Sequence, residues 1–157
     1  MGVIASVTAV GTGLVAGVFY AFSTFVMRAL ARLAPAEGVR AMQAINLTVI
    51  TPLFLGVFLG VAVLSGLLAT AAIIQWGAPG SALRLSGAAL YLAGTFGVTM
   101  VFNVPRNDVL ASLDPGSPTV ETPWRTYLDE WTRWNHVRTA AAVAATAALL
   151  AAAAARP

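Results

Sequence analysis

Four long apolar stretches are the feature of this sequence that most constrains its fold. They cover approximately residues 3–27, 45–74, 83–102 and 137–155. A helix needs about 20 apolar residues to cross the hydrocarbon core of a bilayer, so each stretch is long enough to span one. Of all residues, 59% are hydrophobic and only 10% are charged, whereas a soluble domain has about 25% charged residues. We therefore predict an all-α protein, with residues 1–157 forming one domain built as a four-transmembrane-helix bundle.

Two prolines lie at or near the ends of these predicted helices. Pro52 falls inside the overlong stretch 45–74, which predicts a tilted or kinked helix. Pro105 follows the stretch 83–102. Because proline lacks a backbone N–H and disfavours helical geometry in the residue before it, we expect the third helix to end at this point.

The arginines indicate how the chain is oriented, since all nine basic residues are arginine. The opposite side of the bundle receives only Arg84 and Arg156. The others lie in or next to the two larger connecting segments, 28–44 and 103–136, which must share one side: Arg28, Arg32, Arg40, Arg106, Arg125, Arg133 and Arg138. The positive-inside rule then predicts a cell-membrane protein with both larger segments in the cytoplasm and both termini outside.

The remaining composition excludes several classes of site and partner. The net charge of +3 is too small and too scattered for a nucleic-acid surface, so no nucleic-acid partner is expected. The chain has no cysteine, which excludes disulfides, thiolate nucleophiles and cysteine metal sites. Two glycine pairs, Gly13 with Gly17 and Gly56 with Gly60, are spaced for close helix packing. They predict contacts within the bundle or in a homo-oligomer.

An amphipathic segment precedes the fourth apolar stretch, beginning at Thr122-Pro123, a typical helix start. Two interpretations are open. Tryptophan and arginine beside an apolar helix are typical membrane-interface anchors, whereas polar groups at the depth where a helix enters the bilayer indicate a functional site. If these side chains form a site, they must point into the bundle. One face of the segment carries residues at helical spacing: Trp124, Tyr127, Leu128, Trp131, Trp134, Asn135 and Arg138.

Polar side chains of the other helices are expected at the same level of the bundle. Tyr20 lies near the end of the first helix, Asn46 lies at the start of the second, and Asn103 and Asn107 follow the third. The only histidine, His136, lies beside the aromatic face of the amphipathic segment. If one site is present, Asn103 and Asn107 must approach Asn135, His136 and Arg138.

Four motifs together resemble the anthrone oxygenase-like family of small four-helix membrane proteins. They are FYAFSTFVMRAL at 19–30, MQAIN at 42–46, VFNVPRNDVLA at 101–111 and the W-x2-Y-x3-WTRWNHVRTAA pattern from Trp124 to Ala141. The name of the family derives from members that oxidise anthrones to anthraquinones. The positions that the resemblance carries over are Asn46, Asn103, Pro105, Asn107, Trp131, Trp134, Asn135, His136 and Arg138.

The resemblance implies an oxygenase for a small electron-rich aromatic or polyketide-type substrate, working without a metal or flavin. A deprotonated substrate of this kind reduces dioxygen itself, so the protein supplies a base and groups that stabilise the anion. The expected base is His136, because histidine exchanges protons readily near neutral pH. Arg138 or Arg106 would stabilise the anion. The amides of Asn103, Asn107 and Asn135 would bind the substrate oxygens, and its further contacts would be Asn46, Tyr20, Tyr127, Trp131, Trp134 and Arg106.

Two alternatives remain at the level of sequence. One is a haem held by His136 and a methionine such as Met42 or Met100. A three-ligand metal site is not expected, because one histidine with scattered carboxylates does not make one. The other alternative is a non-catalytic bundle that binds a lipid, a quinone or a partner protein.

Overall fold

The computed structural model describes residues 2–155 and consists of helices joined by short connections. The first long helix comprises α1 (Gly2–Ala21), the π-helical segment η1 (Phe22–Val26) and α2 (Met27–Leu30). Then follow α3 (Pro35–Thr48) and α4 (Pro52–Ile74). The third long helix joins α5 (Ser81–Ala89), two π-helical segments, η2 (Leu90–Gly97) and η3 (Thr99–Asn103), and α6 (Val104–Ala111). The last helix is α7 (Glu121–Ala154).

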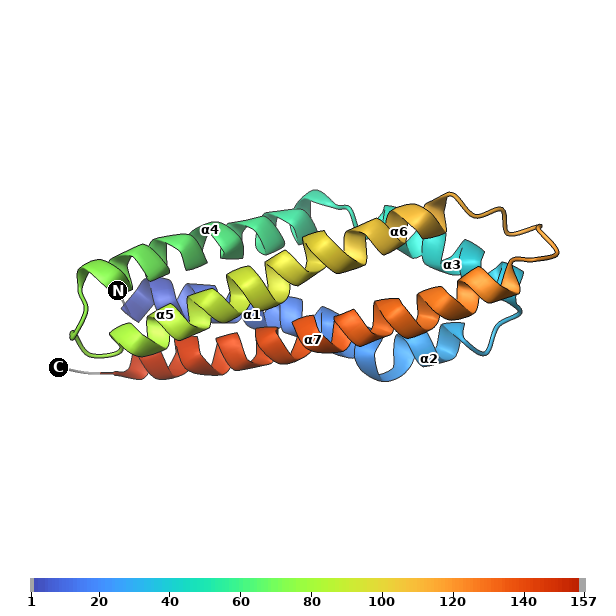
Figure 1. Cartoon of the computed structure of the whole chain (residues 1–157). Helices are drawn as coiled ribbons and strands as arrows, with labels where there is room; N and C mark the ends of the chain where they lie inside the picture. The colour runs from blue at the N-terminus through green and yellow to red at the C-terminus, as the bar shows by residue number, and fades with distance from the viewer. Residues whose placement is uncertain (1, 156–157) are drawn as a thin grey trace.

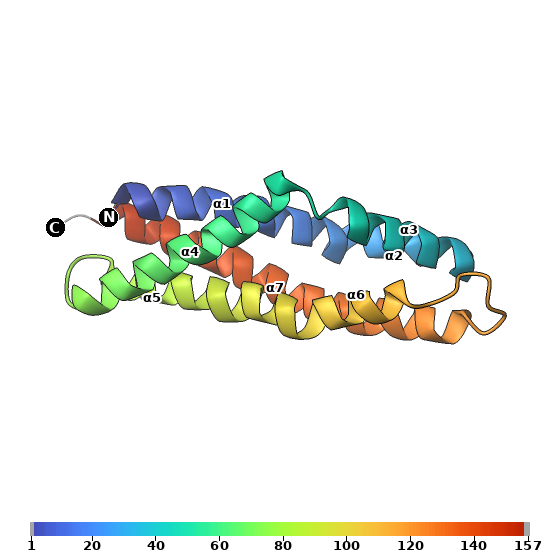
Figure 2. The same cartoon turned by 90° about the horizontal axis from the view of Figure 1, so that it is seen from above.

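The predicted four-helix bundle is confirmed. Four helices are long and apolar enough to cross a membrane: Gly2–Leu30, Pro52–Ile74, Ser81–Ala111 and Glu121–Ala154. They lie lengthwise beside one another, with the start of α1, the end of α7 and the α4–α5 turn at one end (Figure 1). The opposite end holds α2, α3, α6 and the first turns of α7, and the second view agrees (Figure 2). The two arginine-rich connections therefore share one end of the bundle.

The second predicted helix is interrupted, which corrects the range 45–74. Its first residues belong to α3, and the chain leaves helical geometry before Pro52. Thr51 is extended, with φ −105° and ψ 152°, and its Oγ1 accepts a hydrogen bond from the N–H of Phe54 at 3.2 Å. Proline disfavours helical geometry in the residue before it, so Thr51 caps α4 instead of continuing α3.

The third helix, in contrast, does not end at Asn103-Val-Pro105 as predicted. It continues through Pro105 to Ala111. Pro105 falls in the first turn of α6, directly after the π-helical turn η3. The regular i→i−4 pattern is already interrupted by the π-helical turn, so a proline without an N–H is accommodated there without a break. The amphipathic segment is likewise continuous with the fourth span, since α7 runs unbroken from Glu121 to Ala154.

Small residues let α7 approach its neighbours closely. Ala142, Ala145 and Ala152 of α7 are at most 3% exposed. A Cβ atom on Gly94 would lie 2.6 Å from the Cβ of Ala141. The predicted glycine pairs behave differently, because a Cβ on Gly17, Gly56 or Gly60 would meet no described atom within 4 Å. Three of the four predicted glycines therefore make no close contact within the chain, whereas Gly94 packs closely against α7.

Gly87→Ala is expected to lower the free energy of unfolding by about 1–3 kcal/mol, the usual cost of overpacking. The new Cβ would lie 2.8 Å from Leu149 Cγ and 3.3 Å from the carbonyl oxygen of Ala145. Thermal unfolding in detergent measures the change. Gly60→Ala is the matched control, because its Cβ enters open space. Equal losses of Tm in the two variants would contradict this packing.

Candidate functional site

A buried arginine lies at the centre of the polar groups inside the bundle. Arg138 is only 5% exposed. Its guanidinium carbon lies 3.8 Å from the ring centre of Phe19 and 4.9 Å from that of Trp131. A cation over an aromatic face is attracted by the ring quadrupole, and more strongly where water is excluded. The two rings therefore hold the charge between α1 and α7.

Asn135 fixes the orientation of this arginine. Arg138 Nε donates to Asn135 Oδ1 at 2.9 Å. The Nδ2 of the same amide donates to the carbonyl oxygen of Phe19 at 2.9 Å and to Ser23 Oγ at 2.6 Å. Ser23 Oγ in turn lies 3.0 Å from Thr139 Oγ1. The fully buried Asn135 thus links the first and last helices and presents only its oxygen to the cation.

The third long helix completes the surroundings of Arg138. Arg138 Nη1 donates to Thr99 Oγ1 at 3.3 Å, and Thr95 Oγ1 donates to the carbonyl oxygen of Arg138 at 3.4 Å. Nη2 donates no hydrogen bond to any residue in the described range 2–155. We call the set of Arg138, Asn135, Thr99, Ser23, Thr139, Phe19 and Trp131 the arginine cluster.

The arginine cluster contains no carboxylate. Between residues 2 and 155, the ion pairs are Arg106 with Glu130 and Arg125 with Glu121. Neither involves Arg138. A buried charge is costly unless it is paired or well hydrogen-bonded. Arg138 is hydrogen-bonded to neutral groups and stacked on rings, so its positive charge remains available to an anion.

π-helical turns surround this cluster. Ser23 lies in η1, Thr95 in η2, and Thr99 and Asn103 in η3. A π-helical turn holds one more residue than an α-helical turn, and such turns occur often at functional sites. Here the widened turns set the rotation at which these polar side chains face α7.

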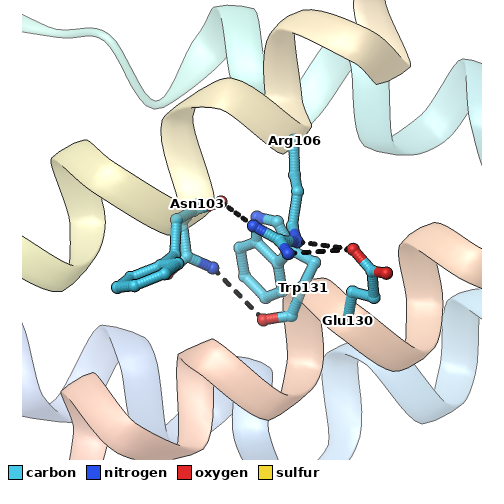
Figure 3. Close-up of polar contacts among 5 residues, drawn as sticks. Asn103, Arg106, Glu130 and Trp131 are labelled. Carbon is cyan, nitrogen blue, oxygen red and sulfur yellow. Dashed lines mark hydrogen bonds and ion pairs between the residues drawn. The ribbon is translucent and has the colours of Figure 1, made fainter.

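Three asparagines and Tyr127 adjoin the arginine cluster through Trp131. Asn103 Nδ2 donates to the Trp131 carbonyl oxygen at 3.2 Å (Figure 3). Asn107 Oδ1 accepts from Tyr127 Oη at 2.9 Å and from Trp131 Nε1 at 2.8 Å. The side chain of Asn46, in α3, lies near Tyr127, whose hydroxyl donates to Asn107 and not to Asn46. The predicted approach of Asn103 and Asn107 to the Asn135–Arg138 face is therefore present, with Trp131 as the connecting residue.

Asn103 holds one acceptor without a partner. Its side chain is 1% exposed, and its Oδ1 accepts no hydrogen bond within the described part of the chain. Leaving such a buried polar atom unsatisfied costs about 1–3 kcal/mol. A hydrogen-bond donor on a bound molecule could satisfy this buried acceptor.

The tryptophan face points mainly into the protein, as the site interpretation requires. Trp124, Tyr127 and Trp131 are at most 5% exposed and pack against Met42 and Leu110. Trp134 is half-buried and stacks on Phe102, with ring centres 3.5 Å apart and planes 8° apart. The inward orientation is confirmed for the first three rings.

Arg106 is bound by Glu130 and by a backbone carbonyl group. Its guanidinium forms an ion pair with Glu130 at 2.9 Å and donates to the carbonyl oxygen of Phe102 at 2.8 Å (Figure 3). The charge of Arg106 is thus already compensated. Of the two arginines that the sequence offered for an anion, Arg138 is the one without a carboxylate partner among residues 2–155.

Two predicted site residues, His136 and Tyr20, are exposed and lie apart from the arginine cluster. His136 is exposed and lines a surface groove between α2 and α7 together with Arg28 and Arg133. Tyr20 is 58% exposed. The structure therefore brings Asn135 and Arg138 together with Asn103 and Asn107, but it does not bring His136 or Tyr20 to them.

Phe19 and Ser23 are contact residues that the sequence reasoning missed. The predicted site residue on this helix was Tyr20, which directly follows Phe19. The signal that could have found them is helical spacing, because Phe19 and Ser23 are four residues apart and such pairs share a face.

The described residues offer no ready metal site. Within residues 2–155, no group of three His, Asp or Glu side chains comes together in a way that could hold a metal ion. Side-chain carbonyls, hydroxyls and one guanidinium make up the polar part of the arginine cluster.

Comparison with known proteins gives one match. Residues 46–148, which include Asn46, the η3–α6 region and most of α7, match the family model described as anthrone oxygenase. Searches of curated proteins and of solved structures found no match. The family match covers more than half of the chain and includes Asn103, Asn107, Trp131, Asn135 and Arg138. The chain therefore belongs to the anthrone oxygenase family.

Proposed function

We propose that this protein is a membrane oxygenase that oxidises a small electron-rich aromatic substrate with dioxygen, without a metal or flavin. The observation that carries the proposal is Arg138, a buried cation with no carboxylate partner among residues 2–155. A substrate anion placed beside it would be stabilised far more than in water, because charges interact strongly where water is excluded. Membership of the family supports the same reaction class.

The surroundings of Arg138 suit a flat ring system. Phe19 and Trp131 offer aromatic faces at the guanidinium. Asn103 Oδ1, the unsatisfied acceptor, would take a hydrogen bond from a phenolic hydroxyl of the substrate. These groups favour a phenol-bearing aromatic that also carries an acidic C–H group.

The proposed reaction converts a ring CH2 and O2 into a ring C=O and water. Loss of one C–H proton gives a delocalised carbanion, which Arg138 stabilises. The carbanion transfers electrons to O2 and forms a C–O bond, and protonation of the terminal oxygen gives a hydroperoxide. Loss of the second C–H proton and cleavage of the O–O bond release water and leave the C=O group. Two electron pairs from the substrate reduce O2, one oxygen entering the product and the other entering water.

Proton removal in this proposal relies on the charge of Arg138. Within residues 2–155, no Asp, Glu or His side chain forms a hydrogen bond with Arg138 or Asn135. A neighbouring positive charge favours the ionised form of an acid, so the substrate would ionise more readily in the cluster and release its proton to water.

Oxygen uptake by the purified protein with an anthrone tests this proposal. We expect one O2 consumed for each quinone formed, with one atom of ¹⁸O from labelled O2 in the new carbonyl group. Label arriving from water instead would contradict oxygenation. Absence of any uptake, combined with a lipid or quinone that remains bound through purification, would favour the alternative of a non-catalytic binding protein.

The proposed membrane orientation places both termini outside and the residues near α3 and α6 in the cytoplasm. Because the chain has no cysteine, single cysteines can report the sidedness. Gln75→Cys in the α4–α5 turn and Ser112→Cys after α6 occupy exposed positions. In whole cells, an impermeant maleimide should label only the cysteine at 75. Labelling of both from outside would contradict the orientation, as would labelling of the cysteine at 112 alone.

The sequence also predicted the side of the membrane on which Arg156 lies and a homo-oligomer packed through glycines. Arg156, which the charge count placed outside, lies beyond the described residues. Gly56 and Gly60 are open toward the exterior of the bundle, so a homo-oligomer could use them as a close-packing surface.

A further inference from the structure

His136 and the residues around it take no part in the proposed oxygenase reaction. The side chain lines a groove of about 450 Å³ between α2 and α7. We call this the His136 groove. Its walls are formed by Met27, Arg28, Ala31, Leu128, Asp129, Thr132, Arg133 and His136. Polar and apolar side chains therefore meet in one surface hollow.

The charge of the His136 groove is net positive. Arg28 and Arg133 are both exposed and form no ion pair with any residue in the described range. Asp129 is the one acidic side chain in the wall, and it too forms no such pair. Two arginines against one carboxylate leave one positive charge, with His136 and Thr132 as further hydrogen-bond donors.

The position of the groove along the helices matches the headgroup level of a membrane. Arg28 lies close to the end of the apolar helix Gly2–Leu30. From His136 to the end of α7 at Ala154 the helix rises about 27 Å, at 1.5 Å per residue, which is close to the roughly 30 Å hydrocarbon thickness.

We propose that the His136 groove binds the phosphate headgroup of an anionic phospholipid. The phosphodiester would lie between Arg28 and Arg133, near His136 and Thr132. Basic pockets between membrane helices are suited to such headgroups, because arginine and phosphate attract one another at the membrane surface. The proposal is independent of the oxygenase reaction, since none of these side chains belongs to the arginine cluster.

Lipid retention measured by native mass spectrometry tests the proposal. The full-length protein would be reconstituted in vesicles of equimolar phosphatidylglycerol and phosphatidylcholine, then extracted in mild detergent. The wild-type protein should retain phosphatidylglycerol preferentially. The double variant Arg28→Gln/Arg133→Gln should bind it roughly thirtyfold more weakly, as expected for the loss of two surface arginines.

The matched control is Arg32→Gln/Arg40→Gln, which removes the same charge from exposed arginines outside the groove. The control should retain phosphatidylglycerol as the wild type does. Equal retention of the two lipids by the wild type would overturn the proposal, as would equal loss in both double variants or unchanged retention in the groove variant. Competition by inorganic phosphate alone, without any preference between the lipids, would assign the groove to free phosphate and would also overturn it.

Discussion

Replacing Arg138 with methionine is expected to lower kcat/KM for anthrone oxidation by about 10²–10³-fold, the usual loss when one group that stabilises an oxyanion is removed. Methionine fills much of the same space between Phe19 and Trp131 but carries no charge. The substrate anion would lose its counter-charge. Oxygen uptake at several anthrone concentrations measures the change.

Two further variants show whether the loss of activity comes from the missing charge at position 138. Arg138→Lys keeps a positive charge and should retain more activity than the methionine variant, although lysine cannot reproduce the guanidinium contacts with both Asn135 and Thr99. Arg125→Gln removes an exposed arginine paired with Glu121 and should leave activity unchanged. Equal activity in the methionine variant and the wild type would show that Arg138 does not stabilise the reacting anion.

Asn135→Asp should abolish most activity, and it also removes the hydrogen bonds that Asn135 Nδ2 donates to Phe19 and Ser23. Asn135 Oδ1 already lies 2.9 Å from Arg138 Nε, so a carboxylate at this position would pair with Arg138 and neutralise it. The substrate anion would then have to compete with an internal anion of the same charge. We expect a loss of about 10²-fold or more in kcat/KM, with the far-ultraviolet circular dichroism of the wild type.

Thr99→Val separates charge from geometry in that experiment. It removes the hydrogen bond from Arg138 Nη1 without adding a carboxylate, so activity should fall by about tenfold, as expected for one hydrogen bond from a charged group worth about 1.5 kcal/mol. Comparable losses in Asn135→Asp and Thr99→Val would mean that the positioning of Arg138 matters more than its available charge, contrary to the proposed role of that charge.

The sequence predicted the membrane helices well because hydropathy acts over about 20 residues. It was less successful at the prolines, where local geometry decides. Pro52 separates α3 from α4 through an extended Thr51, whereas Pro105 is accommodated in the first turn of α6. Both prolines follow apolar helical sequence, and only the neighbouring turns distinguish a break from a continuation.

The candidate site could be predicted in part. Asn135 and Arg138 are three residues apart on the same face as Trp131, so helical spacing was sufficient to group them. His136 follows Asn135 in the chain but lies about 100° round the helix from it, and this rotation places it in the groove. The contact of Thr99 with Arg138 depends on the π-helical turn η3, whose rotation a regular helical pattern does not contain.

Parallel assays of Arg138→Met and His136→Ala test the central role of Arg138 most directly. The proton chemistry of histidine made His136 the expected base, whereas the structure leaves it exposed and gathers the buried polar groups around Arg138. Anthrone-dependent oxygen uptake would be measured for both variants and the wild type at equal amounts of folded protein. We predict that Arg138→Met loses the uptake and that His136→Ala retains it. Retained uptake in Arg138→Met together with lost uptake in His136→Ala would contradict the role proposed for Arg138.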